Sequence, residues 1–296
     1  MGRAKGRGKD AGPRAGDAAP PPPPAAGRLS YADYLRVDDL FGLQRPVSRP
    51  AHHDEMQFIV VHQVFELWFR LLLHETDRVA AMLGRGDDAS LREAVHLLRR
   101  VARILRSLQA QIEILDSMKP ARFLGFRSNL EPASGFQSVQ FREIESAWGL
   151  KDPGHAAHHA GAPGRAGRLE RRIAAPSIPD LLGALLRARG LDWPEGDGEE
   201  VAARRVGAAR AVYEDPERHA LLEDLFEHLL EVDASFALWR RHHVFMVERM
   251  IGRKWGTGGS QGVPYLEATL ARRFFPELWA VRTHLARGPA SEAPPA

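Results

Sequence analysis

The chain of 296 residues is 44% hydrophobic, which is enough to fill the core of one large domain or two small ones. It contains no cysteine, and this excludes disulfide bonds, thiolate metal sites and cysteine nucleophiles. The formal net charge of +3 arises in residues 1–28, which hold six basic and two acidic side chains, whereas the remaining residues hold 35 basic and 36 acidic ones. The body of the protein is therefore electrically balanced.

The two ends of the chain are predicted to lie outside the folded body. Residues 1–28 are basic and rich in glycine, and they include the run Pro20–Pro24, which is typical of a polyproline II spacer after a disordered tail. The tail lacks the apolar segment of a signal peptide and the aromatic side chains that stack on bases, so we expect neither secretion nor nucleic-acid binding from it. One domain is expected over residues 29–288, with disorder over 289–296.

The body is predicted to be all-α, because apolar residues recur at helical spacing and few stretches alternate with period two. The most apolar region, residues 56–73, is interrupted by His62, Glu66 and Arg70, so no membrane span is expected. Residues 151–168 are rich in Gly, Ala and Pro and read as a mobile loop. The predicted helices lie, in chain order, within about 28–44, 54–83, 89–118, from 135 onward, 178–190, 215–232, 234–251 and 266–286.

A histidine lies in the middle of the apolar stretch "FIVVHQVFELWF". On a helix, Phe58, His62 and Phe69 share one face, with Glu66 at its edge. A lone histidine in this position is commonly a core residue whose ring nitrogens are hydrogen-bonded. It is also a candidate ligand or substrate contact, and the stretch alone does not decide between these readings.

A second apolar stretch, "FALWRRHHVFMVERM", contains two adjacent histidines. His243 falls on the stripe of aromatic and methionine side chains that includes Trp239, whereas His242 falls on a weaker one with Leu238. The helical period therefore favours His243 as the inward residue. A histidine among aromatics and methionines, in a chain with no cysteine and no His-Glu-x-x-His motif, suits an axial haem ligand.

Two further features are candidates for ligand binding. The loop "GTGGSQG" allows close backbone approach and carries the hydroxyl of Thr257, although it lacks the ending of a P-loop. Arg127 could bind a carboxylate through two parallel hydrogen bonds, or could simply be a surface arginine. A group of three histidines, at positions 155, 158 and 159, has no further ligand at a metal-site spacing, so a native metal site there is not favoured.

Five stretches together resemble the tryptophan 2,3-dioxygenase family. In order they are "YADYLRVDDL", "HDEMQFIVVHQVFELWF", "FLGFRSNLEPASGFQSVQFR", "LWRRHHVFMVERMIG" and "GTGGSQGVPYL". They span Tyr31 to Leu266, which is nearly the whole body, while the tail and residues 151–168 lie outside the resemblance. The resemblance implies a cytoplasmic, all-helical homotetramer that opens the indole ring of L-tryptophan with O2 on a ferrous haem b, giving N-formyl-L-kynurenine.

The resemblance also implies residue roles. His243 matches the axial ligand of the haem iron, and Ser134 and Gly135 match a turn near the haem edge. His62 matches the residue that faces the indole N–H of the substrate. Arg127 matches the residue that binds the substrate carboxylate, and Thr257 matches the one that lies at the ammonium and carboxylate end of the substrate. The positions that match substrate contacts are Phe58, Ile59, Val60, Val61, His62, Phe123, Arg127 and Thr257, together with Tyr31, Tyr34 and Leu35 from a segment that reaches a neighbouring subunit's pocket.

Three departures from the family leave the choice between tryptophan and a substituted tryptophan open. Phe123 stands where some members have tyrosine, Ile112 replaces an aromatic residue, and Gln261 replaces a common serine. Two alternatives to the dioxygenase remain. One is a related haem monooxygenase that acts on a tryptophan derivative, and the other is a non-enzymatic helical protein that binds nucleic acid through its tail.

Overall fold

The computed structural model describes residues 29–159, 161–256 and 262–285, and these residues form helices and no strands, as predicted. They divide into two compact units, up to Arg45 and from Pro46 onward. The α-helices are α1 (Tyr31–Leu35), α2 (Val37–Phe41), α3 (His53–Arg85), α4 (Asp88–Asp116), α5 (Pro120–Arg127), α6 (Val139–Ala147), α7 (Gly154–Ala157), α8 (Pro163–Ala174), α9 (Ile178–Ala188), α10 (Glu199–Glu214), α11 (Pro216–Ile251), α12 (Val263–Glu267) and α13 (Pro276–Ala280). Short 3-10 turns are η1 (Ser128–Leu130), η2 (Gly135–Gln137) and η3 (Val281–Thr283).

The first unit contains α1 and α2. Ser30 caps α1, because its side chain accepts the N–H of Asp33 at 3.1 Å. Arg36 then adopts the left-handed conformation (φ 54°), so the single helix predicted here is two short ones. Neither helix buries a residue within the described chain, and the side chains of Tyr31 and Tyr34 are 78% and 71% exposed.

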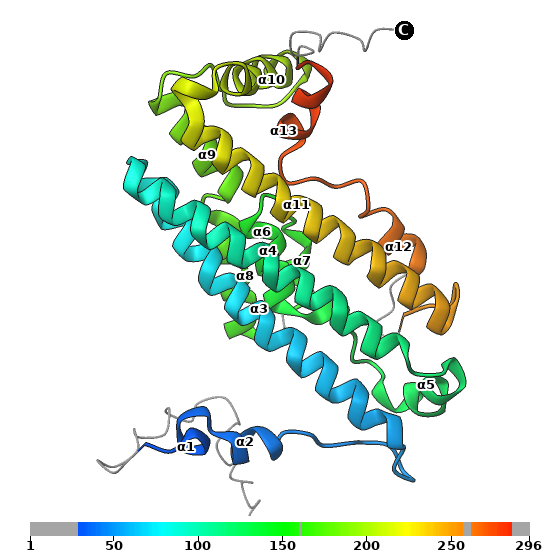
Figure 1. Cartoon of the computed structure of the whole chain (residues 1–296). Coiled ribbons are helices and arrows are strands. Elements are labelled where there is room, and N and C mark those ends of the chain that lie inside the picture. Colours follow the sequence, from blue (N-terminus) through cyan, green and yellow to red (C-terminus); the bar gives the residue numbers. More distant parts are fainter. Residues whose placement is uncertain (1–28, 160, 257–261, 286–296) are drawn as a thin grey trace, which may run out of the picture. The chain divides into compact units, whose positions relative to one another are not determined.

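The second unit is organised around three long helices. The helix α4 lies between α3 and α11 and packs along both of them (Figure 1). It can do so because apolar residues recur around it at helical spacing; among these, Leu91, Leu98 and Leu105 are at most 1% exposed. Full burial of one such side chain contributes about 1.5–3 kcal/mol. The predicted bounds of α3 and α4 agree with the structure to within about two residues.

The helix α11 is continuous where the sequence predicted two helices that meet near Asp233. No glycine or proline interrupts the chain at that point, so the helix has no reason to end. The buried Asp233 carboxylate instead accepts the N–H groups of Phe274 and Phe275, at 3.0 and 3.2 Å. These donors are thereby withdrawn from a helical ladder, and Pro276 starts α13, so the last predicted helix is broken into α12 and α13.

Several helices were not predicted. The proline at position 120, read as the end of the preceding helix, is also the first residue of α5. The segment predicted as a mobile loop over 151–168 contains α7 and the start of α8. Arg168 of α8 pairs with Glu143 of α6 at 2.7 Å and so holds α8 in place. The helix α10 was also not predicted.

The start of α3 is anchored by a buried carboxylate. Glu55 accepts the N–H of Val47 at 2.6 Å, the N–H of Ser48 at 3.0 Å and the hydroxyl of Ser48. Burial alone would raise the pKa of Glu55, but these hydrogen bonds favour the ionised form and lower the pKa below its ordinary value. The preceding loop is thus fixed to the first turn of the helix.

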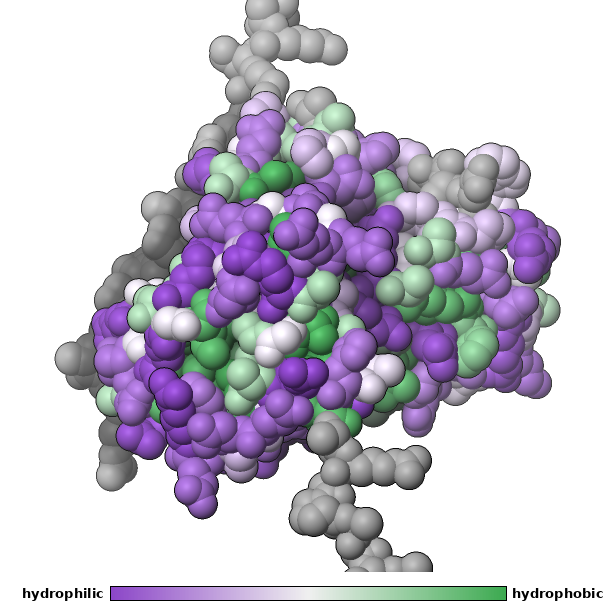
Figure 2. All heavy atoms as spheres, turned by 90° about the horizontal axis from the view of Figure 1, so that it is seen from above, coloured by the Kyte–Doolittle hydropathy of each residue, from purple (hydrophilic) through white to green (hydrophobic). Residues whose placement is uncertain are grey.

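By length and composition alone, α3 is apolar enough to cross a membrane. In the structure it packs against α4, α6 and α9, and its buried residues include Phe69, Leu72 and Val79. It is therefore a core helix of the bundle. The face seen in Figure 2 carries mainly hydrophilic side chains, with apolar ones in small groups between them.

Candidate active site

A large cavity opens between α3 and α11 and is also lined by α5, η2, α6 and α12. Its volume is about 1640 Å³, counting the space at its opening. Much of the wall is aromatic, and rings from α3 and α11 meet edge to face, with the centroids of Phe65 and Trp239 6.4 Å apart. Both histidines singled out in the sequence, His62 and His243, line this cavity.

The His62 ring presents one defined nitrogen to the cavity. Its Nδ1 lies 2.7 Å from the carbonyl oxygen of Phe58, one turn earlier on α3, so Nδ1 carries the proton and donates it. Burial lowers the pKa of His62, although the Phe58 carbonyl and the charge of Glu66 act in the opposite direction. The ring is therefore neutral near pH 7, and its Nε2, which has no partner among the described residues, can accept a hydrogen bond.

The His243 ring is also neutral. Burial, together with repulsion from His62, lowers its pKa to about 4. The ring stacks on Trp239, one turn earlier on α11, with centroids 5.4 Å apart and planes only 10° from parallel. His242 does not line the cavity, so the structure agrees with the helical period in bringing His243, and not its neighbour, to this wall.

Arg127 and Phe123 reach the cavity from α5. Arg127 is the last residue of that helix, and its guanidinium donates to the carbonyl of Trp255, just before the glycine-rich loop. The ring of Phe123 stacks on Phe58 at 5.6 Å and meets Phe126 edge to face at 5.5 Å. This aromatic group fixes α5 against α3 and so positions the arginine.

Other predicted site residues have mixed outcomes. Ser134 and Gly135 line the cavity at the start of η2, where the Ser134 hydroxyl accepts the N–H of Phe136 at 3.3 Å. Ile59, Val60 and Val61 do not line it, although the whole run from Phe58 to His62 was predicted to. Successive residues of a helix are about 100° apart, so Ile59 and Val60 point away from the face of Phe58 and His62. Val61 lies nearer that face, but its side chain is buried in the core. Thr257 lies outside the described residues, and Tyr31, Tyr34 and Leu35 belong to the first unit.

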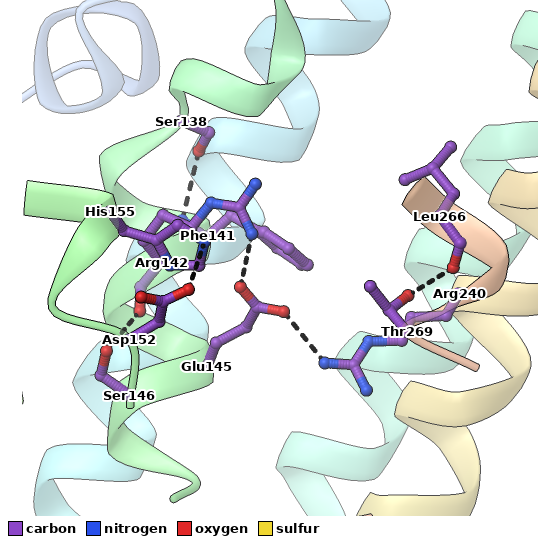
Figure 3. Close-up of polar contacts among 10 residues, drawn as sticks. All are labelled: Ser138, Phe141, Arg142, Glu145, Ser146, Asp152, His155, Arg240, Leu266 and Thr269. Carbon is purple, nitrogen blue, oxygen red and sulfur yellow. Dashed lines mark hydrogen bonds and ion pairs between the residues drawn. The ribbon is translucent and has the colours of Figure 1, made fainter. Parts of the chain in front are cut away.

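The sequence analysis missed a charged part of the cavity wall. Arg142 and Glu145 of α6 and Arg240 of α11 form what we call the ion triad, in which one carboxylate lies between two guanidinium groups (Figure 3). Glu145 Oε2 accepts from Arg142 Nη1 at 2.6 Å, and its Oε1 accepts from Arg240 Nη2 at 3.0 Å. The sequence did contain a signal that Arg240 belongs to the site, because Arg240 precedes His243 by three residues and so lies on the same face of the helix.

Comparisons with known proteins identify the family of the chain. A family model described as tryptophan 2,3-dioxygenase matches residues 23–159 and 198–285, so it extends into the segment 151–168 that the resemblance had excluded. The tryptophan 2,3-dioxygenase of Herpetosiphon aurantiacus is 42% identical over 264 residues, covering 87% of this chain and 98% of the relative. That of Nocardioides sp. is 45% identical over 260 residues, covering 87% and 95%. That of Caulobacter vibrioides is 40% identical over 264 residues, covering 87% and 98%. On this evidence the chain belongs to the tryptophan 2,3-dioxygenase family.

Proposed function

We propose that the chain opens the indole ring of L-tryptophan with O2 to give N-formyl-L-kynurenine, using a ferrous haem b in the cavity between α3 and α11. Family membership supports a dioxygenase that acts on tryptophan and O2, and the family generally uses haem. The observation that carries the proposal is that His62, His243 and Arg127, from three separate helices, line the same cavity.

The residues on this wall fit a haem. The His243 imidazole is neutral, faces the cavity and has no hydrogen-bond partner among the described residues, so a lone pair is available to iron. The flanking side chains of Trp239, Val244 and Val247 offer an apolar surface to a porphyrin. His243 would hold the haem iron through a ring nitrogen, and Ser134 and Gly135 would lie at the edge of the group.

The protein's own side chains would bind and orient the substrate. When bound, the haem supplies the activation of O2, which amino-acid side chains cannot provide. His62 Nε2, free because Nδ1 donates to a backbone carbonyl, accepts the indole N–H. Arg127 binds the substrate carboxylate through two parallel N–H groups, and the hydroxyl of Thr257 acts at the ammonium end. Holding both ends of the substrate restricts the indole to one orientation.

The role of His62 can be tested by replacing it with alanine. The loss of one neutral hydrogen bond costs about 0.5–1.5 kcal/mol, so kcat/KM for L-tryptophan should fall by about two- to twelvefold while haem content stays normal. 1-Methyl-tryptophan, which has no indole N–H, should show no such difference between the two proteins. Unchanged kinetics with L-tryptophan would make His62 an ordinary core histidine.

The first unit supplies an argument for assembly. Tyr31, Tyr34 and Leu35 carry large apolar side chains, all of them exposed in the described chain. Exposed apolar groups of this size favour contact with another protein surface. We assign them to the pocket of a neighbouring subunit in a homotetramer. We take residues 29–288 as the enzyme domain of a cytoplasmic protein, with no nucleic-acid or membrane partner.

Product mass tests the reaction. The purified protein is incubated with L-tryptophan and O2, and the product of a dioxygenase gains two oxygen atoms. A gain of one atom would favour the related monooxygenase that acts on a tryptophan derivative. A purified protein without a Soret absorption band would refute haem chemistry altogether and would favour a binding protein.

A further inference from the structure

A carboxylate of α3 lies in the cavity wall one turn beyond His62. Glu66 lines the cavity, and its charge acts to raise the pKa of the His62 ring against the effect of burial. The other carboxylate of the described cavity wall, Glu145, lies between two guanidinium groups. Glu66 is instead held by an uncharged side chain, that of Gln140 at the second position of α6. The function proposed above gives this contact no role.

Gln140 holds both the backbone and the side chain of Glu66. Its Nε2 lies 2.8 Å from the Glu66 carbonyl oxygen and 2.8 Å from Glu66 Oε2. An amide nitrogen carries two N–H groups, so each of these oxygens can accept one of them. The carbonyl of a residue inside a helix already accepts the N–H four residues later, so the bond from α6 is an additional one. Gln140 and Glu66 together form what we call the α3–α6 clamp.

The α6 end of the clamp is itself fixed in place. Ser138 caps α6, because its hydroxyl accepts the N–H of Phe141 at 3.2 Å. The Phe141 ring packs against Phe69 of α3, with the ring centroids 5.7 Å apart. The start of α6 thus contacts α3 through Gln140 and through the residue that follows it. These contacts allow α6 to fix the position of one turn of α3.

The turn of α3 that the clamp holds is the turn that begins at His62. In an α-helix the N–H of Glu66 donates to the carbonyl of His62, so the two residues are one turn of about 5.4 Å apart. The Phe58 carbonyl, one turn earlier, fixes His62 Nδ1 at 2.7 Å. The direction of Nε2 therefore depends on how α3 is rotated about its axis at this point. A misplacement of about 1 Å can cost about a hundredfold in rate.

We propose that Gln140 is a positioning residue for the indole N–H of the substrate, because it acts through Glu66 to set the direction in which His62 Nε2 points. The inference rests on the proposed function, in which that nitrogen accepts the indole N–H. Gln140 itself does not line the cavity, so it contacts neither the substrate nor the cofactor. Its loss should therefore affect the part of substrate recognition that depends on the indole N–H.

The test uses Gln140→Met, which keeps the length of the side chain and removes both N–H groups. The Kd values of L-tryptophan and 1-methyl-tryptophan are measured without O2 in the full haem-loaded chain, and kcat/KM is measured with O2. Gln140→Met should lower the preference for L-tryptophan over 1-methyl-tryptophan by about two- to fivefold, within the limit of about twelvefold set by His62→Ala. In the His62→Ala background, Gln140→Met should change the preference no further, because the group that it positions is gone.

Gln109→Met is the matched control. Gln109 of α4 donates to the Ser235 carbonyl at 3.0 Å, so this variant also removes a bond from an amide to the backbone of a long helix. The helix in question is α11, which does not carry His62. The control should lower Tm by a similar amount and leave the preference unchanged. If Gln140→Met gave the same result as the control, or weakened binding of both compounds equally, the clamp would be only structural and the proposal would be wrong.

A failure of the proposed function gives a different result. If His62→Ala left the preference of the unaltered protein unchanged, His62 would not accept the indole N–H, and both its proposed role and this inference would be wrong. If His62→Ala lowered the preference while Gln140→Met did not, only this inference would be wrong. A preference that Gln140→Met lowered equally with and without His62 would also overturn it, because Gln140 would then act through another residue.

Discussion

Replacing Arg127 with leucine is expected to remove most of the enzyme's preference for L-tryptophan over tryptamine, which has the indole and amine but no carboxylate. The Arg127 guanidinium lines the cavity and donates to the Trp255 carbonyl, and its other N–H groups have no partner among the described residues. Breaking a hydrogen-bonded charge pair costs about 2–5 kcal/mol. The side chain is only half-buried, so solvent screening favours the lower part of this range. A loss of about 2–3 kcal/mol corresponds to about 30- to 150-fold in kcat/KM for L-tryptophan.

The assay measures kcat/KM for both compounds in the unaltered protein and in Arg127→Leu, with haem content checked by absorption. Arg127→Lys should also be poor, because an ammonium keeps the charge but cannot form two parallel bonds. Arg122→Leu is the matched control, since Arg122 lies on the same helix but does not line the cavity. If the unaltered protein turned over tryptamine as well as L-tryptophan, Arg127 would not bind a carboxylate, and the orientation of the substrate would need another explanation.

Three further predictions concern haem, assembly and pH. His243→Ala should abolish stable haem binding while His242→Ala keeps near-normal haem content per chain; equal loss in both would defeat the assignment of the axial ligand. Deletion of residues 1–28 should leave turnover intact, but deletion of 1–36 should cripple it, because only the longer cut removes the exposed apolar side chains of α1; two equally active truncations would contradict the cross-subunit role. The lowered pKa of Glu55 stabilises the fold fully above its ordinary value of 4.5, and this contribution disappears as the pH falls through the folded-state value. The Tm of the unaltered protein should therefore fall more steeply below pH 4.5 than that of Glu55→Gln, and parallel curves would count against the anchor.

The sequence predicted the helices and histidines that depend on local periodicity. Apolar spacing identified α3 and α4 and distinguished His243 from its neighbour, because a helical stripe is a property of a single segment. The same reasoning failed where distant contacts decide the outcome. The predicted helices 215–232 and 234–251 left out Asp233, yet this residue lies inside α11 and accepts hydrogen bonds from residues more than forty positions away. Ile59 to Val61 were assigned to the pocket as part of a continuous run, but Ile59 and Val60 are turned away from it by the helical period and Val61 is buried in the core.

The ion triad was beyond local reasoning for a related reason. The charged residues of the stretch "VQFREIESA" are typical of a solvent-exposed helix, and nothing in the stretch indicates that other helices bury α6. The structure covers it with α8, whose Arg168 pairs with the buried Glu143, and places it beside the arginine of α11. Burial turns Arg142 and Glu145 from ordinary surface charges into a buried ion pair of the cavity wall. Only the tertiary arrangement carries that information.

The arrangement of the three long helices explains why a cavity exists at all. Both α3 and α11 pack closely along α4, and they meet each other mainly through aromatic side chains such as Phe65 and Trp239. The helix α4 therefore acts as a spacer that sets the distance between His62 and His243. Its own contribution to the wall is small and apolar, through Leu115. The spacer buries a stripe of mainly leucine and valine along its length, so close packing in the core fixes the gap between the two histidines. The two neutral imidazoles and the buried ion triad are therefore held around a cavity by helices that are both packed along α4.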